Sequence, residues 1–145
     1  MPDGFEMLEH EHRAVEDLFD RYEQTGDDAV AEQICTDLSI HGEIEEQVLY
    51  PELREIGERT SLMADEAEES HDLITNLVTR IRHTPSDGRL KLFEELWAMV
   101  DGHVRMEETE VFPELRDAGV DPEELGRSLE AARNEAIARS SGAAG

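Results

Sequence analysis

Cysteine is almost absent from this chain, and its scarcity removes several classes of site. Cys35 is the only cysteine among the 145 residues, so an internal disulfide cannot form. Zinc and iron–sulfur sites built from several cysteines are excluded for the same reason. A metal bound by this chain would therefore depend on nitrogen and oxygen ligands.

Basic residues and long apolar runs are also scarce. The chain has 13 Lys and Arg residues against 37 Asp and Glu residues, which gives a formal net charge of -24. Such a surface repels nucleic acid and anionic membranes, so neither is an expected partner. No segment reaches the roughly 20 apolar residues needed to span a bilayer, and the first residues lack the basic start and apolar run of a signal peptide. We expect a cytoplasmic protein.

Aromatic residues make up only 5% of the chain, and no segment alternates polar and apolar residues as a strand does. Apolar residues instead recur at helical spacing almost throughout. The pattern predicts an all-α fold, with an up-down-up-down four-helix bundle in residues 1–119. Residues 120–145 are expected to form a short fifth helix, to about Arg139, and a disordered tail.

Turn and capping residues set the expected helix boundaries. A turn at Gly26-Asp27-Asp28 separates the first two helices, and Pro51 is expected to kink or end the second. The remaining boundaries are a cap at Thr60 or Ser61, a stop before Thr84-Pro85, a turn at Ser86-Asp87-Gly88, an end near Pro113 and a start at Asp121-Pro122.

Four of the six histidines lie in the apolar stripes of the four main helices, one in each. They are His12, His41, His71 and His103, and Glu45 and Glu107 lie in the same stripes one turn after the second and fourth. With a rise of about 1.5 Å per residue in helices of alternating direction, the four histidines reach a similar depth. A single core histidine is usually satisfied by a neighbour. Four at one depth, with two buried acids that each cost several kcal/mol uncompensated, indicate a metal site.

The ligand types narrow the choice of metal. Imidazole and carboxylate without thiolate suit iron, manganese or zinc. Six ligands are too many for one closed tetrahedral zinc ion. With Glu45 and Glu107 as bridges, they suit two octahedral ions that keep open positions. We therefore expect two iron ions, joined by an oxo or hydroxo bridge.

Four segments resemble the hemerythrin-like, HHE cation-binding family, and the match covers about Leu8 to Leu115. They read LEHEHRAVEDLF, HGEIEEQVLYPEL, EESHDLI and HVRMEETEVFPEL, and the repeated H-x-x-x-E-E…(Y/F)-P-E-L block at His41–Leu53 and His103–Leu115 is the most specific. The resemblance implies a four-helix bundle. It also implies the iron ligands His12, His41, Glu45, His71, His103 and Glu107, with both glutamates bridging.

One departure from the family pattern concerns the third helix. Oxygen-carrying hemerythrins have two histidines there in an H-x-x-x-H pair, but Ala67 stands four residues before His71 and Thr75 four after it. The fifth histidine is therefore absent. Glu68 is one replacement ligand, with a solvated surface acid as the equal alternative. The gap favours a site that reacts with oxygen or peroxide over simple reversible oxygen carriage.

Two further residues are secondary ligand candidates. Glu108 stands five residues after His103, the spacing of the carboxylate in oxygen carriers, so it is the alternative to Glu107. Tyr50 precedes Pro51 and is expected to pack at the end of the bundle. As a phenolate or hydrogen-bond donor, it is also a candidate for the site.

Three functions fit these residues. The first is a diiron protein that binds or reacts with dioxygen, peroxide or nitric oxide, with a catalase-like reaction as one form of that chemistry. The second is a non-catalytic iron or oxygen sensor, or an oxygen-binding protein. The third is a ferritin-like carboxylate site, because Glu9 and His12, like Glu68 and His71, have E-x-x-H spacing. That arrangement leaves His41 and His103 unused.

Overall fold

Helices account for nearly all of residues 3–144, the part of the chain described by this computed structural model, in which the side chains of residues 141–144 are not described. No strand occurs in that part, so the prediction of an all-α fold is confirmed. The α-helices are α1 (Gly4–Thr25), α2 (Asp28–Ile44), α3 (Tyr50–Ile56), α4 (Glu58–Arg82), α5 (Arg89–Met106), α6 (Phe112–Asp117) and α7 (Pro122–Ala144). Two π-helical segments, η1 (Glu45–Leu49) and η3 (Glu107–Val111), and one 3₁₀ turn, η2 (Ser86–Gly88), complete the list.

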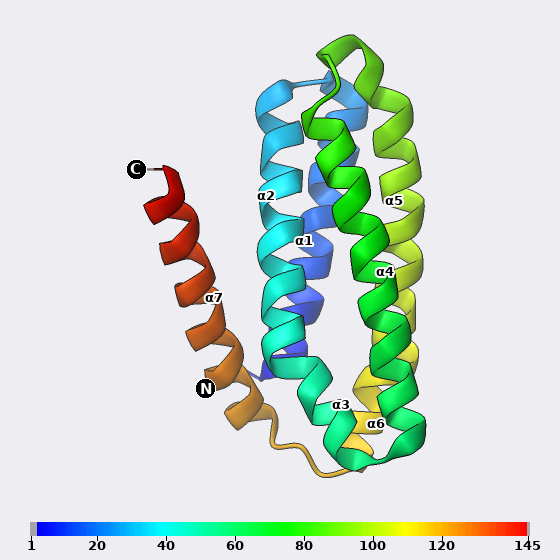
Figure 1. Ribbon diagram of the computed structural model, residues 1–145, viewed down its shortest axis with the longest axis vertical. Coiled ribbons are helices and arrows are strands. Elements are labelled where there is room, and N and C mark those ends of the chain that lie inside the picture. Colours follow the sequence, from blue (N-terminus) through cyan, green and yellow to red (C-terminus); the bar gives the residue numbers. More distant parts are fainter. Residues whose placement is uncertain (1–2, 145) are drawn as a thin grey trace.

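Four of the five long helices, α1, α2, α4 and α5, lie side by side along the long axis of the molecule (Figure 1). Short turns join α1 to α2 and α4 to α5, as the sequence predicts, whereas η1, α3 and Gly57 lie between α2 and α4. Gly26 ends α1 with a φ of 63°, a left-handed conformation that glycine adopts without strain. The Asp27 carboxylate then caps α2 by accepting a hydrogen bond from the Ala29 amide at 2.9 Å. Asp121 accepts one from the Glu123 amide at 3.1 Å beside the start of α7.

The expected helix end near Pro113 is wrong, and of the two outcomes expected at Pro51, a kink or an end, the helix does not end. The helical backbone continues through Pro51 as α3 and through Pro113 as α6. A π-helical segment precedes each of these helices, so the helix widens just before the proline. Proline lacks an N–H and its ring collides with the carbonyl four residues earlier in a regular α-helix. A wider turn removes that collision, and it lets each helix pass its proline.

The other boundary corrections concern α4 and α7. Helix α4 begins at Glu58 without a side-chain cap, and the Thr60 hydroxyl donates to the Gly57 carbonyl at 3.1 Å instead of capping the helix. Helix α7 is longer than expected, because its backbone continues past Arg139 to Ala144. The predicted disordered tail therefore overlaps this helix, and Gly145 lies outside the described residues.

The apolar core is divided into two clusters along the bundle. The upper cluster, near the turn between α1 and α2, contains Val15, Leu38, Ile74 and Val100, among others. The lower cluster contains, among others, Leu8, Ile44, Ala67 and Val111. Helices α1, α2, α4 and α5 each contribute to the upper cluster. In α1, α2 and α4 the histidine lies between residues of the two clusters, and in α5 His103 lies between Val100 and Val104 at the lower end of the upper cluster. The fold thus places a polar layer between two apolar ones.

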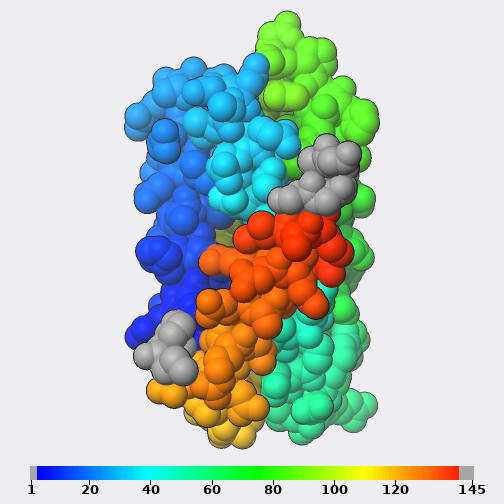
Figure 2. Space-filling model, turned by 90° about the vertical axis from the view of Figure 1, so that its left-hand side faces the viewer, coloured from blue at the N-terminus to red at the C-terminus, as the bar shows by residue number. Residues whose placement is uncertain are grey.

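Helix α7 completes the lower cluster from outside the bundle. It supplies Leu125, Leu129 and Ala132, and Leu129 is fully buried, which stabilises the fold by about 1.5–3 kcal/mol. Gly4 allows the close approach, since a Cβ there would lie 2.6 Å from Leu125 Cγ and 2.8 Å from the Gly126 amide nitrogen. Figure 2 shows α7, in orange and red, lying across the face formed by α1 and α2. Among residues 3–144, no helix is both long and apolar enough to cross a bilayer.

Candidate metal centre

Six residues of the polar layer converge inside the bundle. They form two groups, His12, His41, Glu45 and Glu107, and Glu45, His71, His103 and Glu107. Within each group, one potential ligand atom per residue lies within 4.8 Å of the others. The structure therefore brings together all six residues that the sequence singles out. Six different helical segments supply them, so their convergence depends on the tertiary fold.

Glu45 and Glu107 belong to both groups and face them with different oxygens. Glu45 Oε2 lies 3.2 Å from His41 Nε2, while Oε1 lies 3.0 Å from His71 Nε2. Glu107 Oε1 lies 3.2 Å from His12 Nε2, while Oε2 lies 3.1 Å from His103 Nε2. Each carboxylate therefore presents one oxygen to the His12–His41 pair and the other to the His71–His103 pair.

Both glutamates begin the π-helical segments described above. The wider turn aligns residues five apart, and the Tyr50 hydroxyl, five residues after Glu45, donates to Glu45 Oε1 at 3.2 Å. Helical periodicity did not reveal these segments. The sequence feature that marks these segments is the repeated block, in which H-x-x-x-E is followed by Tyr-Pro or Phe-Pro.

Tyr50 lies at the centre of the second group. Its fully buried hydroxyl is 3.0 Å from His71 Nε2, 3.3 Å from His103 Nε2 and 3.1 Å from Glu107 Oε2. Burial, and then the charges of Glu45 and Glu107, raise the pKa of the Tyr50 phenol. The structure thus brings this secondary candidate into contact with the site.

The buried carboxylates contain atoms that the protein itself does not satisfy. Glu45 and Glu107 are 0% exposed, and Glu45 Oε2 and Glu107 Oε1 have no hydrogen-bond partner among the described residues. A buried carboxylate without compensation costs several kcal/mol. His12 Nε2 and His41 Nε2 face each other at 3.2 Å beside those two oxygens. This set of converging oxygen and nitrogen donors fits a metal cation.

Carboxylates on the outer side orient two of the imidazoles. His12 Nδ1 lies 2.7 Å from Glu108 Oε2, and His41 Nδ1 lies 2.7 Å from Glu11 Oε1. An Nδ1–H that donates to a carboxylate leaves the Nε2 lone pair directed inward, as in many histidine–metal sites. The Nδ1 atoms of His71 and His103 have no such partner in the described part of the chain. The two histidine pairs are therefore supported differently.

The comparisons with known proteins agree with this geometry. A model of the hemerythrin HHE cation-binding domain matches residues 3–115. The chain belongs to the hemerythrin HHE family. The fold is similar to the crystal structure of a hemerythrin HHE cation-binding domain-containing protein from Mycobacterium kansasii, with a TM-score of 0.76 and 22% sequence identity. The alignment covers 94% of this chain and 88% of the Mycobacterium kansasii chain. At that identity the likeness shows the fold alone. A search among curated proteins finds no match.

The position of the missing hemerythrin histidine is filled by an apolar side chain. Ala67 is fully buried in the lower apolar cluster. Glu68 does not replace that ligand in the structure, since it forms an ion pair with Arg54. Glu108 lies outside both groups as well, and contacts His12 and Arg13, the latter at 2.6 Å. Of the three secondary candidates, only Tyr50 touches the converging atoms.

The ferritin-like alternative receives no support from this hemerythrin HHE domain. It requires Glu9 and Glu68 as ligands, but Glu9 lies 3.8 Å from Arg116 and neither glutamate belongs to the two groups found among the described residues. His41 and His103, which that arrangement leaves unused, both belong to them.

The charged groups of the site shift one another's pKa values. Burial by itself lowers the pKa of His103, but the Glu107 and Glu45 carboxylates outweigh it and raise the pKa to about 10. Burial likewise opposes the charged form of His41, and Glu45, Glu11 and Glu107 together hold its pKa well above the usual value. Burial opposes the charge of Glu45, yet its histidine neighbours hold the pKa well below the usual value.

Protein prepared without metal is expected to lose stability between about pH 6.5 and pH 10. His103 keeps its proton up to about pH 10 when folded but only to about pH 6.5 when unfolded. The unfolded state binds fewer protons in this range, so the free energy of unfolding falls by about 1.4 kcal/mol per pH unit for each such group. Glu45 is charged in both states there and does not change the slope. Urea unfolding at several pH values measures the effect.

The metal-loaded protein provides the control for this pH dependence. Metal binding requires deprotonated imidazoles, so metal affinity rises with pH and opposes the loss. A metal-free protein that becomes more stable as the pH rises across this range would contradict the assignment of raised histidine pKa values.

Proposed function

We propose that this protein is a non-haem diiron protein that binds or reacts with dioxygen, peroxide or nitric oxide. The observation that carries the proposal is the orientation of Glu45 and Glu107, each with one oxygen beside each pair of imidazoles. A carboxylate that faces two imidazole pairs is suited to bridging two metal ions. Two iron ions held there would supply electrons to a small oxidant or accept electrons from it.

In the proposed centre each histidine pair binds one ion. His12 and His41 bind the first, His71 and His103 bind the second, and Glu45 and Glu107 bind both. Tyr50 is the proposed additional donor to the second ion, since its hydroxyl lies beside both histidines of that pair. The donor set suits iron among the metals that accept imidazole and carboxylate. The Mycobacterium kansasii protein is described as carrying a cation-binding domain, and we extend cation binding to this chain.

The proposal includes the up-down-up-down order of α1, α2, α4 and α5. Short turns from α1 to α2 and from α4 to α5 support this order, because they join neighbouring ends, and the helical path through η1 and α3 reverses direction at Gly57 before α4 (Figure 1). Alternating direction is also what brings one histidine of each helix to a common level.

A small cavity beside the site supports a small ligand. It has a volume of ≈ 30 Å³ and touches all four histidines of the site. Its remaining wall is largely apolar and includes Val15, Leu38, Ile74, Val100 and Val104. A cavity needs about 10–15 Å³ to hold one water molecule, so this space suits a small ligand such as a diatomic molecule or peroxide. The apolar wall also limits the access of bulk water to the bound ligand.

A non-catalytic iron or oxygen sensor is the second candidate function. The observation that favours it is that Arg133 of α7 pairs with Glu11, whose other oxygen contacts His41 Nδ1, so that metal occupancy would reach the surface through these contacts. In that case the protein would bind iron and an oxidant without turnover.

Anaerobic loading with ferrous iron, followed by mixing with dioxygen or with hydrogen peroxide, tests the proposal. We expect two iron ions per chain and a change in the near-ultraviolet absorption bands with at least one oxidant. Zinc-loaded protein is the matched control, because zinc is not redox-active and gives no change. Iron-loaded protein that responds to neither oxidant would contradict the proposed reactivity. Repeated consumption of peroxide separates the enzyme from the sensor.

A further inference from the structure

Helix α7 reaches the candidate metal centre although it lies outside the residues that match the family model. That match ends at residue 115, whereas α7 begins at Pro122. The Arg133 guanidinium on α7 forms an ion pair with Glu11 Oε2 of α1. The other oxygen, Glu11 Oε1, is the atom 2.7 Å from His41 Nδ1. Arg133, Glu11 and His41 thus form a continuous chain of polar contacts from the molecular surface to the site.

The burial of these side chains makes the chain of contacts sensitive to Arg133. The Glu11 side chain is only 13% exposed, while Arg133 is 39% exposed. A carboxylate with so little access to water depends on its partners for compensation. Arg133 holds one oxygen of Glu11 and thereby directs the other toward the imidazole. Without Arg133, the Glu11 carboxylate is free to turn toward solvent.

A cavity lies beside these residues, between α7 and the bundle. Its volume is ≈ 280 Å³, and residues of α1, α2 and α7 form its wall. Glu11, His41 and Arg133 are among the lining residues, together with the acidic Asp37. Arg133 supplies positive charge beside the two carboxylates, Glu11 and Asp37. Displacement of α7 would expose the outer edge of His41 to water and leave Glu11 without its ion-pair partner.

We propose that Arg133 and Glu11 are positioning residues that fix the His41 imidazole for metal binding, and that docking of α7 is thermodynamically linked to occupancy of the His12–His41 pair. The inference rests on the diiron function proposed above. Linkage is reciprocal, so metal binding stabilises the docked helix to the same extent that the docked helix favours metal. The effect is confined to one ion, because the nearby carboxylate of Glu46 lies 3.8 Å from His71 Nδ1, beyond hydrogen-bond distance, and His103 Nδ1 has no hydrogen-bond partner among the described residues.

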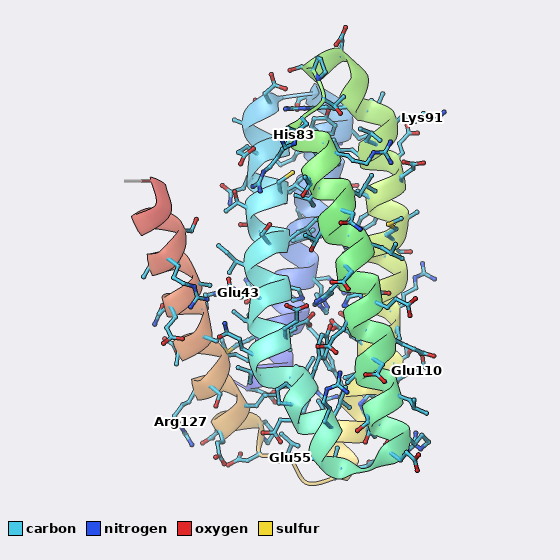
Figure 3. The ribbon with its side chains drawn as sticks, in the orientation of Figure 1. Glu43, Glu55, His83, Lys91, Glu110 and Arg127 are labelled. Atoms are coloured by element: carbon cyan, nitrogen blue, oxygen red, sulfur yellow. The ribbon has the colours of Figure 1, made fainter. Side chains whose placement is uncertain are left out.

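The chain offers a matched control on the same helix. Arg139 also joins α7 to the bundle, through an ion pair with Glu43 of α2. Figure 3 shows Glu43 between α2 and α7. In the described part of the chain, Arg139 and Glu43 form no ion pair or hydrogen bond with the site histidines, and both side chains are at least as exposed as Arg133. Loss of this exposed pair removes one surface contact of α7 and leaves the contacts among Arg133, Glu11 and His41 in place.

The test compares Arg133→Gln with Arg139→Gln and with the unaltered protein, each loaded anaerobically with ferrous iron. Release of iron to a chelator is followed over time. We expect Arg133→Gln to release one of its two ions about 10- to 100-fold faster, because it frees Glu11, the outer hydrogen-bond partner of His41, and loss of such a partner usually weakens metal binding by that factor. The second ion, and both ions of Arg139→Gln, are released at the unaltered rate.

Amide hydrogen exchange of α7 supplies a second readout that does not depend on activity. Loading with iron should slow exchange in α7 of the unaltered protein and of Arg139→Gln, but not of Arg133→Gln. Arg133→Lys, which keeps the charge, should restore part of the slow release. Should Arg133→Gln lose helix content, Glu11→Gln tests the same contact from α1 and is expected to release the same ion faster.

The outcomes distinguish this inference from the function on which it rests. An unaltered protein that takes up no iron overturns the diiron proposal itself. An unaltered protein that binds two ions, with equal release from Arg133→Gln and Arg139→Gln, overturns only the role of α7. Exchange in α7 that is the same with and without iron also overturns the linkage.

Discussion

Replacement of Glu107 by glutamine is expected to abolish binding of both metal ions rather than one. The reason is that each Glu107 oxygen lies beside a different histidine pair, at 3.2 Å from His12 Nε2 and 3.1 Å from His103 Nε2. Glutamine keeps the shape of the side chain but loses the charge that offsets two cations in a buried site. Metal analysis after anaerobic loading and gel filtration measures the loss.

Glu110→Gln is the matched control for this experiment. Glu110 belongs to the same π-helical segment as Glu107 but is exposed, and Figure 3 shows it at the periphery of the bundle. This variant should retain both ions. Retention of one ion by Glu107→Gln would show that the carboxylate serves a single metal, and the bridging arrangement would then be incorrect.

Loading with iron is expected to raise the midpoint of thermal unfolding by roughly 20 °C. The metal-free site contains two fully buried glutamates, each with one oxygen that lacks a hydrogen-bond partner among the described residues. An ion present at 1,000 times its dissociation constant adds about 4 kcal/mol to stability, so two ions add about 8 kcal/mol. For a chain of this size, each kcal/mol corresponds to about 2–4 °C. Circular dichroism of anaerobic samples measures the shift.

The Glu107→Gln variant separates specific binding from a general effect of iron on this shift. Its midpoint should not change on addition of iron. If the unaltered protein melts at the same temperature with and without iron, then metal binding is not coupled to folding. That result would count against both the diiron centre and the sensing alternative, because sensing requires occupancy to change the stability of some part of the protein.

The sequence predicts which residues converge at the site better than it predicts the contacts that surround them. Helical spacing alone assigned His12, His41, His71 and His103 to the interior, and the buried face of a helix follows directly from such spacing. Glu68 has a helical position similar to that of a ligand, yet Arg54 binds it at the surface. Which acid turns inward thus depends on partners from elsewhere in the chain, and periodicity carries no information about them.

The outer contacts of the site were not predicted for the same reason. Glu11 is adjacent to His12 in sequence but supports His41 of another helix. The π-helical segments also escaped prediction, because a turn one residue wider departs from the spacing that identifies a helix. Helix α7 is only weakly amphipathic in sequence, and its packing depends on a surface that includes Gly4 of α1.

The two repeated blocks give the centre an approximate internal twofold symmetry, which a single oxygen atom breaks. Tyr50 and Phe112 occupy equivalent places, each five residues after a shared glutamate and directly before a proline. The Phe112 ring lies parallel to the His12 imidazole, with centroids 6.2 Å apart, whereas the Tyr50 ring brings a hydroxyl to His71 Nε2 at 3.0 Å. An apolar ring therefore backs the His12–His41 half of the centre, and a hydroxyl backs the His71–His103 half. Two metal ions held there would have chemically unequal surroundings.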